Sequence, residues 1–317
     1  MNTILSIIVP TYNEERKQDL FEFLDSVGRQ TYRNIETIVV VEQSKSFYNA
    51  LLQFIKENGL NVKAIFSDGL QGISYSRNLG IENALGSLIA ITDDDAILSP
   101  DWAKTLVETY EKYPEAIGVT GEALPLWINS SDSWFPKALY WMIGCTGFRG
   151  WDTQKPTNVT SGVNMSFRAE VFRVEKFPLA LGGGASAQGK LGFPNEDNDF
   201  ALKITGIIKR PIIYNPKLKV LHKVYPHRLQ SKYIRKYAFW QGCAEARYSD
   251  MWYAKTERKP LRFNLLKDLS IDVLGSFFLN YKDAIKKTKV IIPTFIFFSV
   301  GYASYKIWGY QQLSRII

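Results

Sequence analysis

The sequence predicts an α/β protein with one mostly parallel β-sheet, helices on both faces and a C-terminal helical appendage. Short apolar runs alternate with helical-period segments through the first 120 residues, which is the pattern of a helix-covered parallel sheet. Apolar residues make up 46% of the chain and charged residues 22%, so a full core can form. A chain of 317 residues can hold one large domain and an appendage.

The first 120 residues contain the elements of this sheet in order. Four apolar runs predict buried strands, at residues 4–9, 34–41, 62–66 and 88–91. Segments with apolar residues at helical spacing separate them, at residues 20–27, 47–57 and 72–84. A helix at residues 100–113 and a strand at 117–120 continue the alternation.

The strand at residues 88–91 leads into the chain's most informative motif, the acid trio Asp93, Asp94 and Asp95. Open α/β sheets bind their ligands at the carboxyl ends of strands. Three adjacent carboxylates repel one another and need a cation, and hard oxygen ligands suit Mg²⁺ or Mn²⁺. The alternative is an acidic turn, because Asp is common in turns.

Polar side chains also follow the three earlier strands, and we expect them to converge on the acid trio. They are Thr11, Tyr12 and Asn13 after the first strand, Glu42 after the second and Asp68 after the third. Arg77 lies near the start of the helix at 72–84, where free N–H groups and a guanidinium can hold phosphate. Alternatively, Arg77 pairs with an Asp of the trio.

Three motifs in this order resemble those of family 2 glycosyltransferases of the GT-A fold. They are Ser-Ile-Ile-Val-Pro-Thr-Tyr-Asn-Glu at residues 6–14, Ser-Arg-Asn-Leu-Gly at 76–80 and Thr-Asp-Asp-Asp at 92–95. The resemblance implies a nucleotide-diphosphate-sugar donor, a divalent metal and inversion at the anomeric carbon. It implies metal contacts from Asp93 and Asp95, and donor binding by Thr11, Tyr12, Asn13, Glu42, Asp68, Arg77, Asp93 and Asp94. One departure is Glu42-Gln43-Ser44, where many members carry Asp-Asp-Gly-Ser.

A second acidic motif, Glu196-Asp197, opens a further predicted helix. Acids at a helix N-terminus are stabilised by its dipole, so capping alone would explain the pair. Sugar transfer to a hydroxyl also needs a carboxylate base. The pair resembles the family's Glu-Asp motif, so we assign Asp197 as the base and Glu196 as its support. The glycine-rich stretch before it, with Gly183 and Gly184, is expected to form the acceptor loop.

Strands are predicted at residues 158–164, 212–216 and 219–222, and the last of these carries His222. GT-A enzymes often place a third metal ligand there, although a lone His is also common as a packed or surface residue. Lys223 and Arg228 follow and are expected to neutralise the leaving diphosphate. Aromatic residues at 127–151 form either a packed insertion or a platform for the acceptor.

The chain is expected to divide into a GT-A catalytic domain at residues 1–254 and a helical region at 255–317. Residues 1–120 would form the nucleotide-sugar-binding half of the first, and 121–254 its acceptor and catalytic half. Residues 290–304 are apolar between lysines, but shorter than the ~20 residues of a membrane span. An interfacial or re-entrant segment with a basic collar is therefore favoured. The alternative is a helix packed on the catalytic domain or in a dimer.

Charge and cysteine content limit the partners and the compartment. Lys and Arg total 39 against 31 Asp and Glu, a net charge of +8, which suits phosphorylated substrates or anionic lipid. No motif supports nucleic-acid binding. The two cysteines have no metal-ligand spacing, and the N-terminus lacks a signal-peptide pattern. We therefore expect a cytoplasmic protein, peripheral or monotopic on the inner face of the cell membrane.

These observations predict an inverting glycosyltransferase that uses Mn²⁺ or Mg²⁺. Its donor would be a nucleotide-diphosphate sugar, and its acceptor a hydroxyl of a glycan or lipid-linked saccharide. One alternative is a catalytically silent partner protein that binds nucleotide sugar or glycan. A nucleotidyltransferase is another, but such enzymes usually carry a glycine-rich, basic loop after the first strand, where this chain has Thr-Tyr-Asn at 11–13.

Overall fold

The computed structural model describes residues 3–12, 14–68, 72–146, 152–179, 195–251 and 281–316. The chain divides into two compact units. The first unit comprises Met1–Pro125 and Trp151–Lys223, and the second comprises Leu126–Gly150 and Val224–Ile317.

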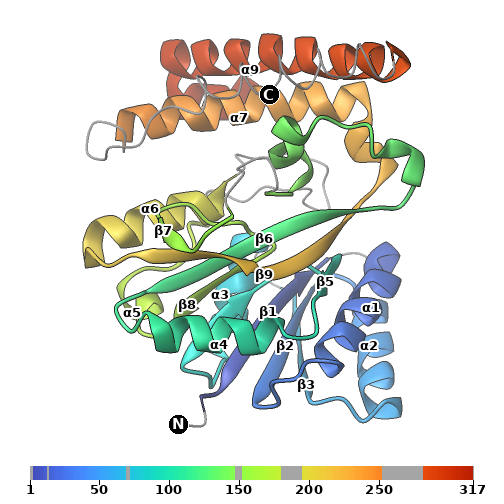
Figure 1. Ribbon diagram of the computed structural model, residues 1–317, viewed down its shortest axis with the longest axis vertical. Coiled ribbons are helices and arrows are strands. Elements are labelled where there is room, and N and C mark those ends of the chain that lie inside the picture. The colour runs from blue at the N-terminus through green and yellow to red at the C-terminus, as the bar shows by residue number, and fades with distance from the viewer. Residues whose placement is uncertain are drawn as a thin grey trace. The chain divides into compact units, whose positions relative to one another are not determined.

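Four parallel strands of the first unit lie in the order β3-β2-β1-β4 (Figure 1). They are β1 (Leu5–Thr11), β2 (Ile35–Glu42), β3 (Val62–Ser67) and β4 (Leu88–Ile91). In register, Leu5 of β1 is paired with Ile35 of β2 on one side and Leu88 of β4 on the other. All four lie where the apolar runs predict strands.

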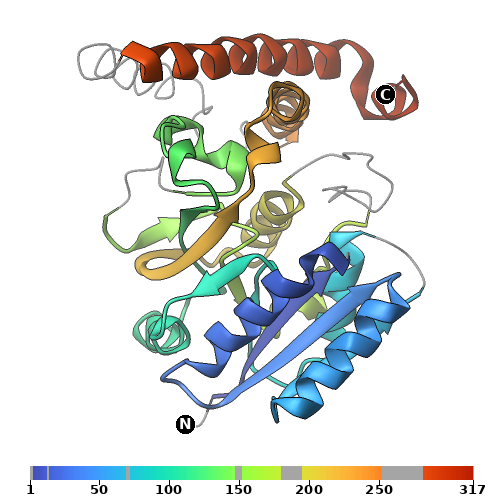
Figure 2. The same ribbon diagram turned by 90° about the vertical axis from the view of Figure 1, so that its right-hand side faces the viewer.

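Helices cover both faces of these strands, because alternate side chains of a strand point to opposite faces. Leu5, Ile7 and Val9 of β1 join a core cluster with residues of α1, α2 and α4. Ile8 joins a second cluster with residues of α5 and α6. Figure 2 shows α1 and α2 side by side on one face of the sheet. The helices are α1 (Lys17–Gly28), α2 (Lys45–Glu57), α3 (Ile73–Glu82), α4 (Trp102–Lys112), α5 (Val171–Val174) and α6 (Glu196–Ile208).

Beyond β4 the sheet becomes mixed. Its order continues β8-β6-β9-β5, with β7 also paired to β9, which gives nine strands within the described residues. The pairs β4-β8, β6-β8, β5-β9 and β7-β9 are antiparallel, so the parallel arrangement holds for the first four strands. These further strands are β5 (Ala96–Leu98), β6 (Gly118–Trp127), β7 (Lys155–Thr157), β8 (Met165–Arg168) and β9 (Ile212–Val224).

Several expectations about strands beyond β4 differ from the structure. The strand predicted at residues 158–164 is wrong, because the chain turns there: the Asn164 N–H donates to the Ser161 carbonyl at 2.8 Å, and strand β8 begins only at Met165. The two segments predicted at 212–216 and 219–222 form one continuous strand, β9. The short strands β5 and β7 were not predicted, and β6 extends to Trp127 beyond the strand predicted at 117–120.

The second unit has its own apolar core. Side chains of the 3₁₀ helix η3 (Lys137–Ile143), of α7 (Ser231–Met251) and of α9 (Tyr281–Ile316) meet there, among them Leu139, Ile234 and Val290. The described part of the aromatic segment is therefore largely packed inside this unit. The predicted linker at 255–262 and the amphipathic segment at 265–279 lie outside the described residues.

Helices α7 and α9 make a very close contact at two glycines. A Cβ atom on Gly242 would lie 2.0 Å from the Phe298 carbonyl oxygen, and one on Gly301 would lie 1.9 Å from that of Phe239. In Figure 2, α7 is viewed nearly along its axis while α9 runs across the view, so the two helices cross. The backbones touch at this crossing, and no side chain larger than hydrogen fits there.

Candidate active site

Asp93, Asp95 and His222 each present one ligand atom, and these atoms all lie within 4.8 Å of one another. The unpredicted strand β5 creates this arrangement, because it pairs Ala96, next to the acid trio, with His222 of β9. His222 Nε2 lies 3.1 Å from Asp95 Oδ1, and the Lys223 N–H donates to the Asp95 carbonyl at 3.0 Å. The sequence-predicted metal ligands are therefore brought together.

The donor set fits a divalent cation. Two ligand atoms at right angles around Mg²⁺, each about 2.1 Å from it, are about 3.0 Å apart, close to the 3.1 Å between His222 Nε2 and Asp95 Oδ1. Carboxylate and imidazole donors suit Mn²⁺ and similar ions. Asp95 and His222 are buried, whereas the Asp93 side chain is 30% exposed, so the group has one side open to a ligand.

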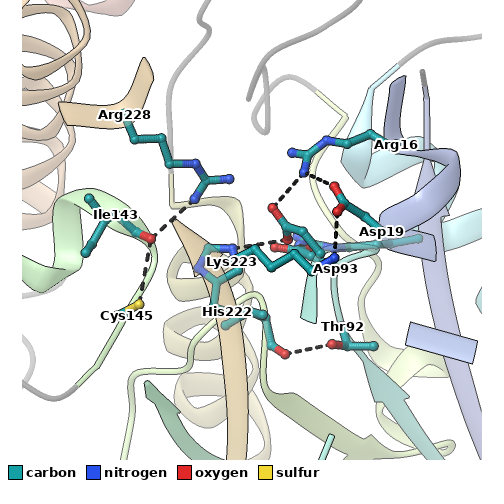
Figure 3. A network of polar contacts seen from close by, with 12 residues as sticks. Arg16, Asp19, Thr92, Asp93, Ile143, Cys145, His222, Lys223 and Arg228 are labelled. Carbon is teal, nitrogen blue, oxygen red and sulfur yellow. Dashed lines mark hydrogen bonds and ion pairs between the residues drawn. The ribbon is translucent and has the colours of Figure 1, made fainter. Parts of the chain in front are cut away.

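Arg16 is a member of this site that the sequence analysis missed. It ends the 3₁₀ helix η1 (Glu14–Arg16), and its Nη1 donates to Asp95 Oδ2 at 2.9 Å and to Asp19 Oδ2 at 3.1 Å (Figure 3). Burial opposes its charge, but Asp95 and Asp94 outweigh this and raise the pKa of Arg16. The sequence gives no signal for this role, because Glu14-Glu15-Arg16 is an ordinary polar turn.

Lys223 and Arg228, predicted to face the leaving diphosphate, have other partners. Lys223 is buried, and its Nζ lies 2.8 Å from Asp19 Oδ1 and 2.6 Å from Glu22 Oε2 (Figure 3). Arg228 belongs to the second unit, where it donates to the Ile143 carbonyl at 3.3 Å. Lys223 thus extends an ion-pair chain that runs from Asp95 through Arg16 and Asp19.

The ends of β1 and β2 are tied to the site by buried polar contacts. The Thr11 hydroxyl donates to Asp94 Oδ2 at 2.6 Å, and burial raises the pKa of Asp94 to about 7. Glu42 accepts from the Gly72 N–H at 3.1 Å and from the Ser76 hydroxyl at 2.6 Å. The Glu42 carboxylate therefore occupies the N-terminus of α3, where the sequence suggested that a phosphate could bind.

Arg77 joins the acid trio to the Glu-Asp pair. Its Nη1 lies 2.5 Å from Glu196 Oε1, its Nη2 lies 3.5 Å from Asp93 Oδ1, and the residue is 1% exposed. The guanidinium also lies over the Phe177 ring, 5.5 Å from its centre. The pairing of Arg77 with an Asp of the trio, considered from sequence as an alternative, is present together with this second ion pair.

Asp197 is buried beside Glu196 at the start of α6. Burial, followed by the neighbouring Glu196 charge, raises the pKa of Asp197 to about 6, although Arg77 and the N–H groups of Asn198 and Gly162 oppose the rise. A Cβ on Gly162 would lie 3.1 Å from Arg77 Nη2 and 3.6 Å from Asp197 Oδ2. A carboxylate with a pKa near 6 is suited to accept a proton at neutral pH.

The remaining predicted residues lie at the strand ends or outside the described ranges. Tyr12 follows β1 and is partly exposed, and Asp68 follows β3 and is exposed. Asn13, Gly183 and Gly184 lie outside the described residues.

Solved structures with a similar fold include a mannosyltransferase and GalNAc-T7. The mannosyltransferase PcManGT of Pyrobaculum calidifontis, solved with GDP-Man and Mn²⁺, matches with a TM-score of 0.57 and 17% identity, over 98% of this chain and 84% of that one. GalNAc-T7, solved with UDP, GalNAc and Mn²⁺, matches with a TM-score of 0.56 and 13% identity, over 85% of this chain and 54% of that one. The fold is that of GT-A glycosyltransferases.

Sequence comparison identifies the family. The model described as glycosyl transferase family 2 matches residues 6–174. The glucosyl-dolichyl phosphate glucuronosyltransferase of Haloferax volcanii is 31% identical over 270 residues, which cover 84% of this chain and 83% of that protein. This chain belongs to glycosyl transferase family 2, as its motifs predict.

Proposed function

We propose that this protein is an inverting, metal-dependent glycosyltransferase that moves a sugar from a nucleotide-diphosphate donor to a hydroxyl of a lipid-linked saccharide. The observation that carries the proposal is the position of Arg77, which contacts Asp93 of the acid trio and Glu196 of the Glu-Asp pair. These two ion pairs support the proposal that the acid trio binds the donor and that the Glu-Asp pair supplies the base at the same sugar ring.

The donor side combines the metal ligands with the ends of β1, β2 and β3. Asp93, Asp95 and His222 would hold Mn²⁺ or Mg²⁺. A bound cation supplies positive charge to the diphosphate, which becomes more negative as it leaves. Thr11, Tyr12, Glu42 and Asp68 would lie beside the nucleoside. Each Glu42 oxygen already accepts one hydrogen bond, and its second lone pair can accept one from a base N–H.

On the acceptor side, Asp197 would take the proton of the attacking hydroxyl. The acceptor oxygen forms its bond to the anomeric carbon as the bond to the diphosphate breaks, so a single displacement inverts the configuration there. Glu196 stays ion-paired to Arg77 and holds α6 beside the acid trio. Asp197 is the better base of the two, because burial raises its pKa to about 6, whereas Glu196 is held in an ion pair with Arg77.

The acceptor class rests on a relative and on helix α9. The relative from Haloferax volcanii is named for a dolichyl-phosphate-linked substrate. Within the described ranges, Tyr281–Gly309 is a helical stretch long and apolar enough to cross a membrane, judged by length and composition alone. We propose that this helix associates with the cytoplasmic face of the cell membrane, where a lipid-linked acceptor resides.

The surface of α9 supports this association. Its exposed large aliphatic residues fall on one side of the helix, at spacings of seven, four, four and seven residues: Ile285, Ile292, Ile296, Val300 and Ile307. Lysines occur near the start of the same helix, and anionic headgroups attract such clusters: Lys282, Lys286, Lys287 and Lys289.

A thermal-shift screen of nucleotide sugars with and without Mn²⁺, followed by a transfer assay, tests the function. A cognate donor with Mn²⁺ should raise the melting temperature by several degrees, because ligand binding stabilises the native state. Asp95→Asn should abolish the Mn²⁺-dependent part of the rise. The control Asp25→Asn removes an exposed carboxylate that is ion-paired to Arg29 and should match the wild type.

The configuration of the transferred sugar, read by NMR, then decides the stereochemistry. A product that keeps the donor's configuration would overturn inversion. If the protein binds the donor but shows neither transfer nor slow hydrolysis of the donor, the silent binding protein would be favoured instead.

A further inference from the structure

Two arginines flank the proposed metal ligands. Arg16 Nη1 lies 2.9 Å from Asp95 Oδ2, and Arg77 Nη2 lies 3.5 Å from Asp93 Oδ1. The ligand atoms of Asp93 and Asp95 lie within 4.8 Å of each other, and carboxylates at this distance repel one another strongly in a buried site. The two guanidinium groups therefore neutralise the acids on which a cation would act.

The two arginines differ in how firmly they are held. Arg77 is 1% exposed and is ion-paired to Glu196 as well. The Arg16 side chain is 16% exposed, and its Nη1 contacts Asp19 Oδ2 at 3.1 Å besides Asp95. If the contact with Asp95 broke, Arg16 would still be ion-paired to Asp19.

We propose that Arg16 is the resident counter-charge of Asp95, and that it increases the mutual dependence of metal and diphosphate binding. A dication close to Arg16 meets like charge, so the metal alone binds weakly. A diphosphate supplies negative charge to both cations and removes this penalty. The inference rests on the proposed metal-dependent function and adds a positioning residue to it.

The chemistry of Arg16 suits this role better than that of Lys223. A guanidinium can form two parallel hydrogen bonds to phosphate oxygens while it retains part of its contact with a carboxylate. Lys223 Nζ is ion-paired to both Asp19 and Glu22. If the ammonium group moved to a ligand, both carboxylates would lose this ion pair. Because coupling between two ligands is reciprocal, diphosphate must bind more tightly with metal to the same degree that metal binds more tightly with diphosphate.

The test is a Mn²⁺ titration of the full chain, read as free Mn²⁺ by electron paramagnetic resonance, with and without inorganic pyrophosphate. Titrations without protein correct for Mn²⁺-pyrophosphate formed in solution. With Mn²⁺ alone, Arg16→Gln should bind about tenfold more tightly than the wild type. With saturating pyrophosphate the wild type should gain about tenfold or more in Mn²⁺ affinity, whereas Arg16→Gln should gain clearly less, namely the part that direct attraction between metal and diphosphate supplies.

Two further variants complete the design. Arg29→Gln, at an exposed ion pair with Asp25 at the end of α1, is the matched control and should behave as the wild type. Arg16→Lys keeps the charge without the forked geometry and should lie between wild type and Arg16→Gln. It also decides the sign of the effect if Arg16→Gln does not fold.

If Arg16 only held the Asp95 side chain in position for the metal, its replacement would weaken Mn²⁺ binding instead of strengthening it. Weaker binding of Mn²⁺ alone by Arg16→Gln, with the gain from pyrophosphate unchanged, would overturn the inference and leave the proposed function intact. No Mn²⁺ binding by wild type or variants, with or without pyrophosphate, would overturn the metal in the proposed function and this inference with it.

Discussion

At the scale of single residues, the site depends on buried charges that compensate one another. Arg77 is 1% exposed and contacts both Glu196 and Asp93, while Asp197 lies beside Glu196. A buried charge is tolerated when it is paired, and removal of one partner leaves the other uncompensated at a cost of about 3–5 kcal/mol. The same side chains that hold the site together thus influence the protonation of the proposed base, Asp197.

Replacement of the proposed base, Asp197→Asn, should lower transfer by roughly 10²–10⁴-fold with donor binding unchanged, because the acceptor hydroxyl loses its proton acceptor. In the wild type, kcat should fall as the pH is lowered through about 6, where Asp197 becomes protonated. Initial rates at saturating donor from pH 5 to 8 measure both effects. Near-normal transfer by the variant would exclude Asp197 as the base.

The same substitution should raise stability at alkaline pH. The pKa of Asp197 is about 6 in the folded protein against an ordinary value of 3.8, so the folded state holds this proton more tightly. The stabilisation from this protonation is present below about pH 4 and is lost as the pH rises through about 6. Urea unfolding at pH 8 should show Asp197→Asn more stable than wild type by roughly 1–3 kcal/mol. If Asp197→Asn were equally or less stable than wild type at pH 8, burial of the charged Asp197 carboxylate would not destabilise the folded protein as proposed.

At the scale of elements, local pattern predicts β1, β2, β3 and β4, because each is a buried run of apolar residues long enough to be recognised. The short strand β5 (Ala96–Leu98) exists through its pairing with β9, more than 100 positions away in the chain, and no local pattern reports that pairing. Residues 158–164 have strand-like composition, yet the turn at Asn164 brings the Gly162 N–H to Asp197. Tertiary contacts decide both cases.

The candidate site shows the same division between local and long-range information. The acid trio, the Glu-Asp pair and His222 were recognisable as candidates because each is a motif or ends a predicted strand. The role of Arg16 and the ion pair between Arg77 and Glu196 were not recognisable, since the partners lie far apart in sequence; Arg77 and Glu196, for example, are 119 positions apart.

The crossing of α7 and α9 gives a prediction at this scale. Alanine usually stabilises a helix by up to about 1 kcal/mol relative to glycine, but in Gly301→Ala the new Cβ would lie 1.9 Å from the Phe239 carbonyl oxygen. The variant should lose about 1–3 kcal/mol in the second unit. Hydrogen exchange should then be faster in α7 and α9 and unchanged in β1 to β4.

The control for this experiment is Gly28→Ala, because a Cβ at Gly28 has no heavy atom within 4 Å. It should be neutral or slightly stabilising. Unchanged protection of α7 and α9 in Gly301→Ala would mean that the two helices do not cross at these glycines.

At the scale of the whole molecule, a net charge of +8 and one apolar helix face combine in a way that suits an anionic membrane surface. Ile292 and Ile296 are 53% and 54% exposed, one turn apart on α9. Large aliphatic side chains on one face of a helix gain free energy when they leave water together, and neighbouring lysines add attraction that salt weakens.

The double substitution Ile292→Lys and Ile296→Lys should reduce binding to vesicles of anionic and neutral phospholipid at least about tenfold in co-sedimentation, because two charges replace apolar contact. Leu85→Lys is the matched control, since Leu85 is 80% exposed in the first unit and should not affect binding. Equal binding by the double variant and the wild type would show that this face of α9 does not meet lipid.

The link made by Arg77 also limits how this enzyme can be recombined with its relatives. A chimaera whose junction falls between residues 77 and 196 takes the guanidinium from one parent and its carboxylate partner from the other. Parents that differ at either position would yield a hybrid with an unmatched charge in its interior. Domain exchange intended to alter acceptor choice should therefore transplant the two positions as a set.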